Sequence, residues 1–144
     1  MKWLILIHLI ATLMMTGIIW VIQIVHYPLF KHVGESNFPQ YEREHTNRIT
    51  LVVLPLMLAE AITALLLVFQ TRYQLNIAPL WIGLGLLGII WGVTFFLNVP
   101  QHTALATTFN PKIHNALVLS NWIRTFSWSI RAGIAVWIVS KAMI

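Results

Sequence analysis

The chain has 144 residues, of which 58% are hydrophobic and 9% are charged, and its mean hydropathy is +0.78. A soluble domain carries roughly a quarter charged residues, so this composition excludes an ordinary soluble domain and predicts an integral membrane protein with one domain over 1–144. The net charge of +5 favours contact with membrane lipids and not with nucleic acid, and the absence of cysteine excludes disulfides, thiolate metal sites and cysteine catalysis.

Four apolar segments are each long enough to cross a bilayer, since a membrane-spanning helix needs about 20 residues. They cover 3–27, 48–70, 77–99 and 113–140. The first segment continues too far, without a small-residue cleavage site, to be a signal peptide. Together the four segments predict an all-α, integral membrane antiparallel four-helix bundle with up-down-up-down topology. No internal repeat is evident.

Asparagine and proline mark two of the expected helix starts, because Asn is a good N-cap and Pro is tolerated in a first turn. Asn37 and Pro39 predict that the second helix begins before its apolar segment and stands above the bilayer. Asn110 and Pro111 predict the start of the fourth helix. An even number of spans after a short basic N-terminus favours cytoplasmic termini, and the expected location is a bacterial inner membrane.

Five of the six histidines lie near one end of the predicted bundle. This end holds the polar connection 31–47, and we call it the loop end. Within the connection, a Glu-x-x-His pair places a carboxylate and an imidazole side by side on a helix. Imidazole-rich sites suit copper, iron and zinc, or a haem. The sequence therefore predicts a metal or haem site whose ligands come from His26, Glu42, His45, His102 and His114, the alternative being that each histidine is an exposed interfacial residue.

Three of the predicted helices have a polar face at the helical spacing of 100° per residue. Lipid disfavours such faces, so they are expected to point inward and open at the loop end. Gln23, Asn98 and Asn121 are then expected to orient ligands or substrate. Four tryptophans are expected either to line an apolar substrate pocket or to form interfacial belts: Trp20, Trp91, Trp122 and Trp128.

Glu60 and Arg124 are charged residues within the predicted spans and are expected at comparable depth. An unpaired charge near the bilayer centre costs at least about 2.5–3.5 kcal/mol, so the sequence predicts an ion pair between them, directly or through Asn121. Arg131 is expected to reach the far interface or to pair near His8. Either the Glu60–Arg124 pair joins two helices, or it is catalytic, with the arginine anchoring an anionic or carbonyl group of a substrate.

The third span carries Gly85, Gly88 and Gly92 on one side. Small residues at this spacing allow helices to approach closely in membranes. The face is expected to contact either a neighbouring helix of the same chain or a second copy in a homo-oligomer.

Three motifs, HYPLF at 26–30, NVPQHTALA at 98–106 and NWIRTFSW at 121–128, resemble those of small, uncharacterised four-helix bacterial membrane proteins. In size and helix number the chain is also similar to anthrone-oxygenase-like membrane proteins, which implies oxidative chemistry on an aromatic or lipid-soluble substrate. The expected function is a membrane-embedded metalloprotein, an oxidoreductase acting on a small lipophilic molecule. The open alternatives are a metal-free enzyme with a histidine base, a small proton- or ion-coupled transporter or channel, and a non-catalytic assembly subunit.

Overall fold

The structure is a computed structural model, and it describes residues 1–71 and 77–142. Secondary structure in these two ranges is entirely helical and forms four long segments. The elements in chain order are α1 (Lys2–Val21), η1 (Ile22–His26), α2 (Tyr27–Leu29) and η2 (Phe30–His32) in the first segment, α3 (Phe38–Thr71) in the second, α4 (Ile77–Val93), η3 (Thr94–Asn98) and α5 (Val99–Leu105) in the third, and α6 (Pro111–Ala142) in the fourth.

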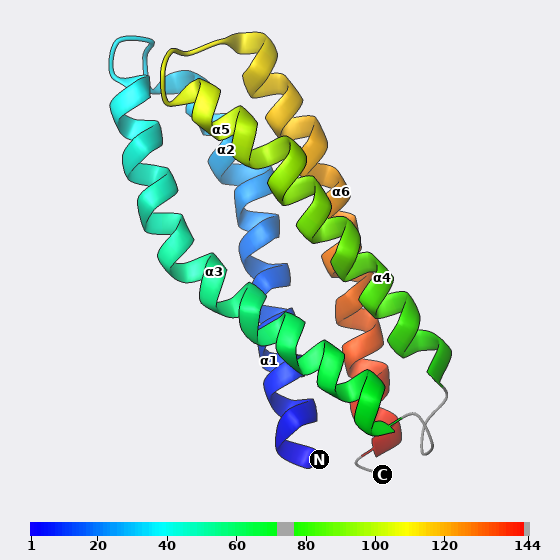
Figure 1. Cartoon of the computed structure of the whole chain (residues 1–144). Helices are drawn as coiled ribbons and strands as arrows, with labels where there is room; N and C mark the ends of the chain where they lie inside the picture. The colour runs from blue at the N-terminus through cyan, green and yellow to red at the C-terminus, as the bar shows by residue number, and fades with distance from the viewer. Residues whose placement is uncertain (72–76, 143–144) are drawn as a thin grey trace.

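The four segments lie side by side (Figure 1). The beginning of α1 and the end of α6 lie at the same end of the molecule, opposite the loop end. α1 packs mainly on α6 and α3, and α4 packs mainly on α6. The early start of α3 at Phe38 confirms the prediction from Asn37 and Pro39. The Oδ1 atom of Asn110 accepts the backbone N–H groups of Lys112 and Ile113, at 2.9 and 3.3 Å, which confirms the predicted cap of α6.

Three helical stretches are long and apolar enough to cross a membrane, namely Lys2–His32, Phe38–Gln70 and Ile77–Leu105. Among the described helices, α6 is long but falls outside this group, although 113–140 was expected to be a fourth span. α6 has no stretch as apolar as those of the other three segments, because its buried face carries amide, hydroxyl and guanidinium groups.

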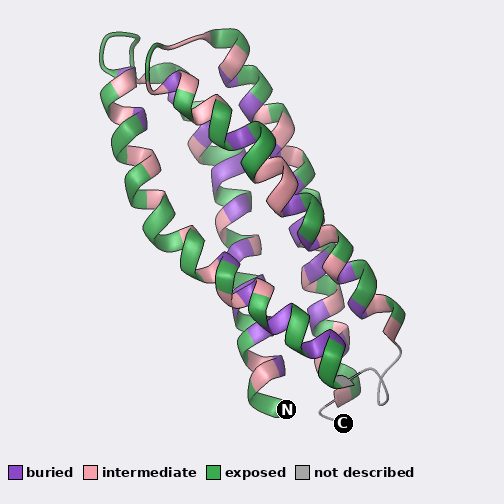
Figure 2. Cartoon of the chain, in the orientation of Figure 1, coloured by how far each residue is buried: buried purple, intermediate pink, exposed green. Residues whose placement is uncertain are grey.

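Several polar and charged side chains are buried, and many large apolar side chains are exposed. Figure 2 colours each residue by its burial. Phe96 is 79% exposed and Leu51 is 77% exposed, whereas Glu60 is 0% exposed. Apolar side chains also pack in the interior in two clusters, one that contains Trp128 and Phe30 and one that contains Leu67 and Ile5. The interior is therefore a mixture of apolar packing and buried polar contacts.

Two of the four segments contain a π turn, η1 in the first and η3 in the third. The residue after each π turn donates its backbone N–H to a carbonyl five residues earlier, the bond that defines a π-helix. Pro28 and Pro100 follow shortly after these turns. Proline lacks an N–H, and its ring clashes with the carbonyl four residues earlier in a regular α-helix. The wider π turn accommodates each proline without ending the helix.

The two π turns are separated by the same number of residues as Pro28 and Pro100, and again by the same number as Pro39 and Pro111. The α1–α3 pair and the α4–α6 pair thus share a pattern: a π turn, then a proline, then a short connection and a helix with proline in its first turn. No internal repeat was expected, because few residues other than these prolines match between the α1–α3 half and the α4–α6 half. The spacing of the prolines was the available signal.

The glycines of α4 divide into two groups by what surrounds them. A Cβ atom added to Gly85, Gly88 or Gly92 would meet no heavy atom within 4 Å, so helices of the same chain do not pack closely on this face. Contact with a second copy through the three glycines stays a prediction. Gly83, which the sequence did not single out, lies against Arg131 and Ile134.

Candidate functional site

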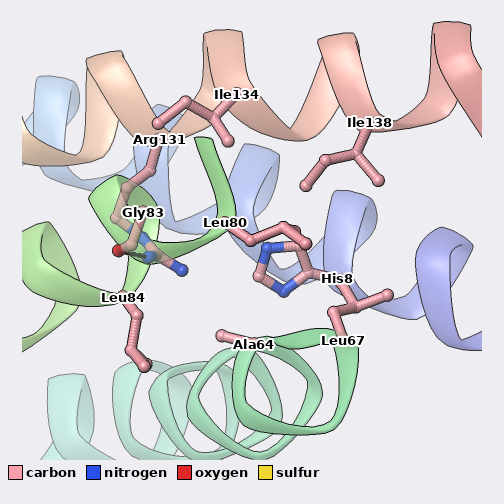
Figure 3. A pocket seen from close by; sticks show the side chains of 9 residues that line it. All are labelled: His8, Ala64, Leu67, Leu80, Gly83, Leu84, Arg131, Ile134 and Ile138. Atoms are coloured by element: carbon pink, nitrogen blue, oxygen red, sulfur yellow. Dashed lines mark hydrogen bonds between the residues drawn. The ribbon is translucent and has the colours of Figure 1, made fainter. Parts of the chain in front are cut away.

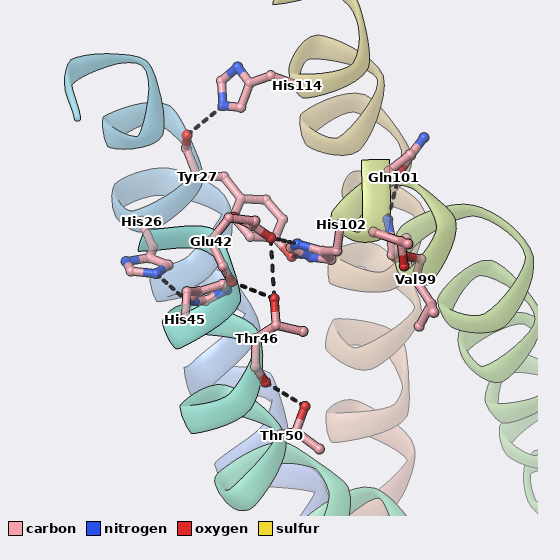
Figure 4. A network of polar contacts seen from close by, with 12 residues as sticks. His26, Tyr27, Glu42, His45, Thr46, Thr50, Val99, Gln101, His102 and His114 are labelled. Carbon is pink, nitrogen blue, oxygen red and sulfur yellow. Dashed lines mark hydrogen bonds and ion pairs between the residues drawn. The ribbon is translucent and has the colours of Figure 1, made fainter. Parts of the chain in front are cut away.

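A buried carboxylate, an imidazole and a phenol form a continuous chain at the loop end (Figure 4). Glu42 of α3 is fully buried, and its Oε1 atom contacts Nδ1 of His102 in α5. Nε2 of His102 lies 2.9 Å from the hydroxyl of Tyr27 in α2. With a carboxylate at Nδ1, the imidazole proton is favoured on that nitrogen, so Nε2 accepts the hydrogen bond from the Tyr27 hydroxyl.

The second carboxylate oxygen of Glu42 is buried and lacks a hydrogen-bond partner among the described residues. Thr46, one turn later in α3, donates to the Glu42 carbonyl at 2.6 Å and approaches only Oε1 of the carboxylate, at 3.4 Å. A buried carboxylate oxygen without a donor is costly, and such an atom is a place where water, an ion or a ligand would bind favourably.

Two further imidazoles lie beside this chain. Nε2 of His26 in η1 is 2.9 Å from Nδ1 of His45, the histidine of the Glu-x-x-His pair. The ring of His45 lies 5.8 Å, centroid to centroid, from that of His102. The predicted gathering of His26, Glu42, His45 and His102 at the loop end is therefore present, and each of these side chains is hydrogen-bonded to another member.

His114 lies apart from these four side chains. It is buried in α6, its Nε2 atom is 2.8 Å from the backbone carbonyl of Tyr27, and its ring lies near those of Phe30 and Phe109. Within the described residues, no group of three or more His, Cys, Asp or Glu side chains is placed to hold a metal ion. The metal and the haem stay predictions.

The predicted orienting residues form one network below the chain from Glu42 to Tyr27. The Asn121 amide donates to Gln23 Oε1 at 2.9 Å, which joins α6 to η1. Nη1 of Arg124 donates to the side-chain oxygens of Asn121, at 3.0 Å, and Asn98, at 3.2 Å. The guanidinium also acts electrostatically on the Tyr27 hydroxyl. Gln23, Asn98 and Asn121 therefore hold an arginine next to the phenol.

The predicted ion pair between Glu60 and Arg124 is wrong. Glu60 pairs with Arg131, whose Nη2 and Nε atoms lie 2.9 and 3.0 Å from Oε1. The other carboxylate oxygen accepts the indole N–H of Trp128 at 2.9 Å, and Thr12 donates to Oε1 at 2.9 Å. Arg124 lies over the Trp128 ring, 5.2 Å from its centroid, and has no carboxylate partner among the described residues.

Glu60 and Arg124 lie at different depths. His114 contacts Tyr27, Tyr27 contacts His102, and His102 contacts Glu42, so His114 and Glu42 lie at about the same level. Counted from Glu42, Glu60 lies about 27 Å along α3, and counted from His114, Arg131 lies about 26 Å along α6. These equal depths explain why Glu60 meets Arg131.

Arg131 also donates to the backbone carbonyl of Gly83 in α4 and lines a small recess with His8 (Figure 3). Nδ1 of His8 lies 2.9 Å from the Thr63 hydroxyl. The expectation that Arg131 is near His8 is confirmed. The sequence did not predict the contact of Arg131 with Gly83 or the hydrogen bond between Tyr27 and His102. A backbone carbonyl and a single tyrosine have no distinctive sequence pattern.

An apolar groove of about 480 Å³ lies between α1 and α3 on the outer surface. Its wall is aliphatic except at His26. The lining residues are Leu13, Met14, Gly17, Ile18, Val21, Ile22, His26 and Ile49.

None of the four tryptophans that were expected to line an apolar pocket contributes to this groove. Trp20 packs edge-on against Trp122, with ring centroids 5.8 Å apart, and donates its N–H to Ser129. Trp128 is buried against Glu60.

Comparison of the chain with protein-family models, with curated proteins and with solved structures found no significant match.

Proposed function

We propose that the four helical segments form an antiparallel bundle that crosses a membrane, with α6 as the fourth span. The support is the distribution of side chains on α6. Leu119, Phe126 and Ile130 are 69%, 56% and 53% exposed on its outer side, whereas Arg124 and Arg131 are 6% and 2% exposed. Exposed apolar area is unfavourable in water and favourable in lipid. Inward arginines with partners avoid the cost of charge in hydrocarbon.

Within this bundle we propose an enzyme that acts on a small lipophilic substrate by proton transfer. The observation that carries the proposal is the buried chain from Glu42 through His102 to Tyr27. The Tyr27 hydroxyl would give its proton to Nε2 of His102, and the Glu42 carboxylate would stabilise the resulting imidazolium. Burial disfavours the tyrosinate left behind, and the positive charge of Arg124 offsets part of this cost. Tyr27 could then take a proton from a substrate and return it at another atom.

A metal-dependent oxidoreductase is the second candidate, and one observation favours it. The Oε2 atom of Glu42 is buried without a hydrogen-bond partner among the described residues, and a cation would satisfy it. The other oxygen of this carboxylate contacts His102, whose ring lies near that of His45. His26, Glu42, His45 and His102 would supply ligands after side-chain rotation, and copper, iron or zinc suits such ligands.

Lipid extracts provide a test that does not require the substrate in advance. Membranes from cells that express the parent chain should contain a lipophilic product that is absent with H102N or Y27F, as measured by mass spectrometry. The matched control is H32N, because His32 is exposed and lies outside the network. H32N should retain the product.

The mass of the product separates the two candidate reactions. An unchanged mass, or the mass of an added or lost water, supports acid–base chemistry. Loss of two hydrogens or gain of oxygen, together with metal that co-purifies with the parent but not with H45A, supports the oxidoreductase. Equal products from the parent and H102N would exclude the chain from Glu42 to Tyr27 as the reacting site.

A further inference from the structure

The groove between α1 and α3 has the shape and chemistry of a site for an elongated lipophilic molecule. Its lining extends along the first segment from Leu13 to His26, which is about 20 Å at the rise of a helix. Its volume of about 480 Å³ lies within the range of small-molecule sites. Leu13, Met14 and Val21 are exposed on the outer surface, so the groove is open towards the surrounding lipid.

One polar group interrupts the aliphatic wall. The imidazole of His26 uses Nε2 for its contact with His45, and its Nδ1 atom has no hydrogen-bond partner among the described residues. A polar atom next to hydrocarbon is unfavourable when it lacks a partner. A ligand whose polar group reaches Nδ1 would satisfy that atom, whereas an ordinary lipid chain would not.

The position of His26 determines how such a ligand would lie. His26 is near the loop end of the first span, and the rest of the groove extends towards the middle of that span. A molecule with one polar group at its end lies in the same way in a bilayer, with its head at the interface and its body in hydrocarbon. Among the described residues that line the groove, His26 is the one titratable side chain and none is formally charged, so a neutral head is favoured over an ionised one.

We propose that this groove binds a neutral, single-headed lipophile whose terminal carbonyl group accepts a hydrogen bond from Nδ1–H of His26, while Nε2 of the same ring accepts the Nδ1–H of His45. The proposal rests on the lipophilic substrate proposed above and names its class and entrance. The head of the bound molecule would lie beside His45, which is adjacent to His102. Substrate would thus enter laterally from the membrane and present its polar group to the buried chain.

Gly17 offers a direct way to block the groove. It lines the groove, is exposed, and a Cβ atom added to it would meet no heavy atom within 4 Å. G17L should therefore fill the groove without disturbing the helix. G133L is the matched control, because Gly133 of α6 is equally exposed and open but lies outside the groove.

The test is photolabelling of the full chain in lipid nanodiscs, with a long-chain methyl ketone that carries a diazirine on its chain. Mass spectrometry should locate the label on groove residues of α1 and α3. G17L should lower labelling by about tenfold or more, and G133L should leave it unchanged. H26F retains an aromatic ring but removes both nitrogens, that is, Nδ1 and the Nε2 atom that contacts His45. It should lower labelling about fivefold, the effect of one net hydrogen bond to the ligand.

Two outcomes would overturn the proposal. One is equal labelling of the parent and G17L. The other is equal labelling by the corresponding diazirine alkane without the ketone, which would mean that the groove holds ordinary lipid only. The H102N variant distinguishes this binding proposal from the proposed reaction. If H102N is still labelled and no lipid extract contains a product, the binding site stands and the proposed enzyme is rejected.

Discussion

The two buried arginines of α6 differ in what neutralises them. Arg131 has a carboxylate partner in Glu60 and donates to the carbonyl of Gly83, whereas Arg124 is surrounded by the amide oxygens of Asn98 and Asn121. A paired charge contributes to helix packing, and removal of one partner leaves the other buried and uncompensated. Amide oxygens neutralise less charge, so Arg124 retains positive potential towards the Tyr27 hydroxyl.

We expect E60Q and R131Q each to destabilise the protein by about 3–5 kcal/mol, because each leaves a buried charge without its partner. The double variant should lose less unfolding free energy than the sum of the losses in the two single variants. Unfolding followed by tryptophan fluorescence measures this coupling, with Trp128 in direct contact with Glu60 as a reporter.

Two comparisons make this prediction specific. Glu44 and Arg48 form an exposed pair at 3.7 Å, and E44Q should change stability by about 0.5 kcal/mol or less. E60Q combined with R124Q should show weaker coupling than E60Q with R131Q. Stronger coupling between Glu60 and Arg124 would contradict the pairing described above.

At the scale of the helix, the π turns determine which side chains face the interior after each proline. η1 carries Gln23 and His26 and leads directly to Tyr27, and η3 carries Asn98 and precedes His102. A π turn holds one residue more than an α turn, so the residues beyond it face about 100° away from the direction that a regular α-helix of the same sequence would give them. π turns are frequent at functional sites for this reason.

Deletion of Ile24, an exposed residue of η1, should convert the π turn to an α turn. The shorter turn would leave the residues beyond it facing as before, but it would place Pro28 in a regular α-helix, where the proline ring clashes with the carbonyl four residues earlier. We expect a loss of stability of about 3 kcal/mol, together with loss of the lipid product, because the turn that carries Gln23 and His26 is rebuilt. I24A keeps the chain length and should resemble the parent in both measurements. Parent-like behaviour of the deletion would show that the π turn has no role in the site.

For the whole molecule, the arrangement of the segments predicts how the chain crosses the membrane. α3 and α6 both end at the end that holds the N-terminus. Reporter fusions after Gln70 and at the C-terminus should therefore report the same face of the membrane, which by expectation is the cytoplasmic face. A fusion within 33–37 should report the opposite face. Opposite results for Gln70 and the C-terminus would mean that α6 does not cross.

Some features follow from the sequence because they depend on local interactions. Apolar length identifies three stretches that are long and apolar enough to cross a membrane, Asn110 determines the cap of α6, and Asn37 with Pro39 determines the early start of α3. The clustering of histidines at one end also follows, since alternating helices return the chain to the same boundary. Each of these inferences needs only spacing along the chain.

Other features depended on the relative height and rotation of the helices, which spacing alone does not specify. Glu60 pairs with Arg131 and not with Arg124 because α3 begins at Phe38, well before its apolar segment, so that Glu60 lies as far from the loop end as Arg131. His114 turned away to the carbonyl of Tyr27, and Tyr27 itself became the end of the buried chain because η1 rotates it towards His102. A shift of one or two helical turns is small in sequence but exchanges every contact across a helix interface, so only the packed structure decides which side chains meet.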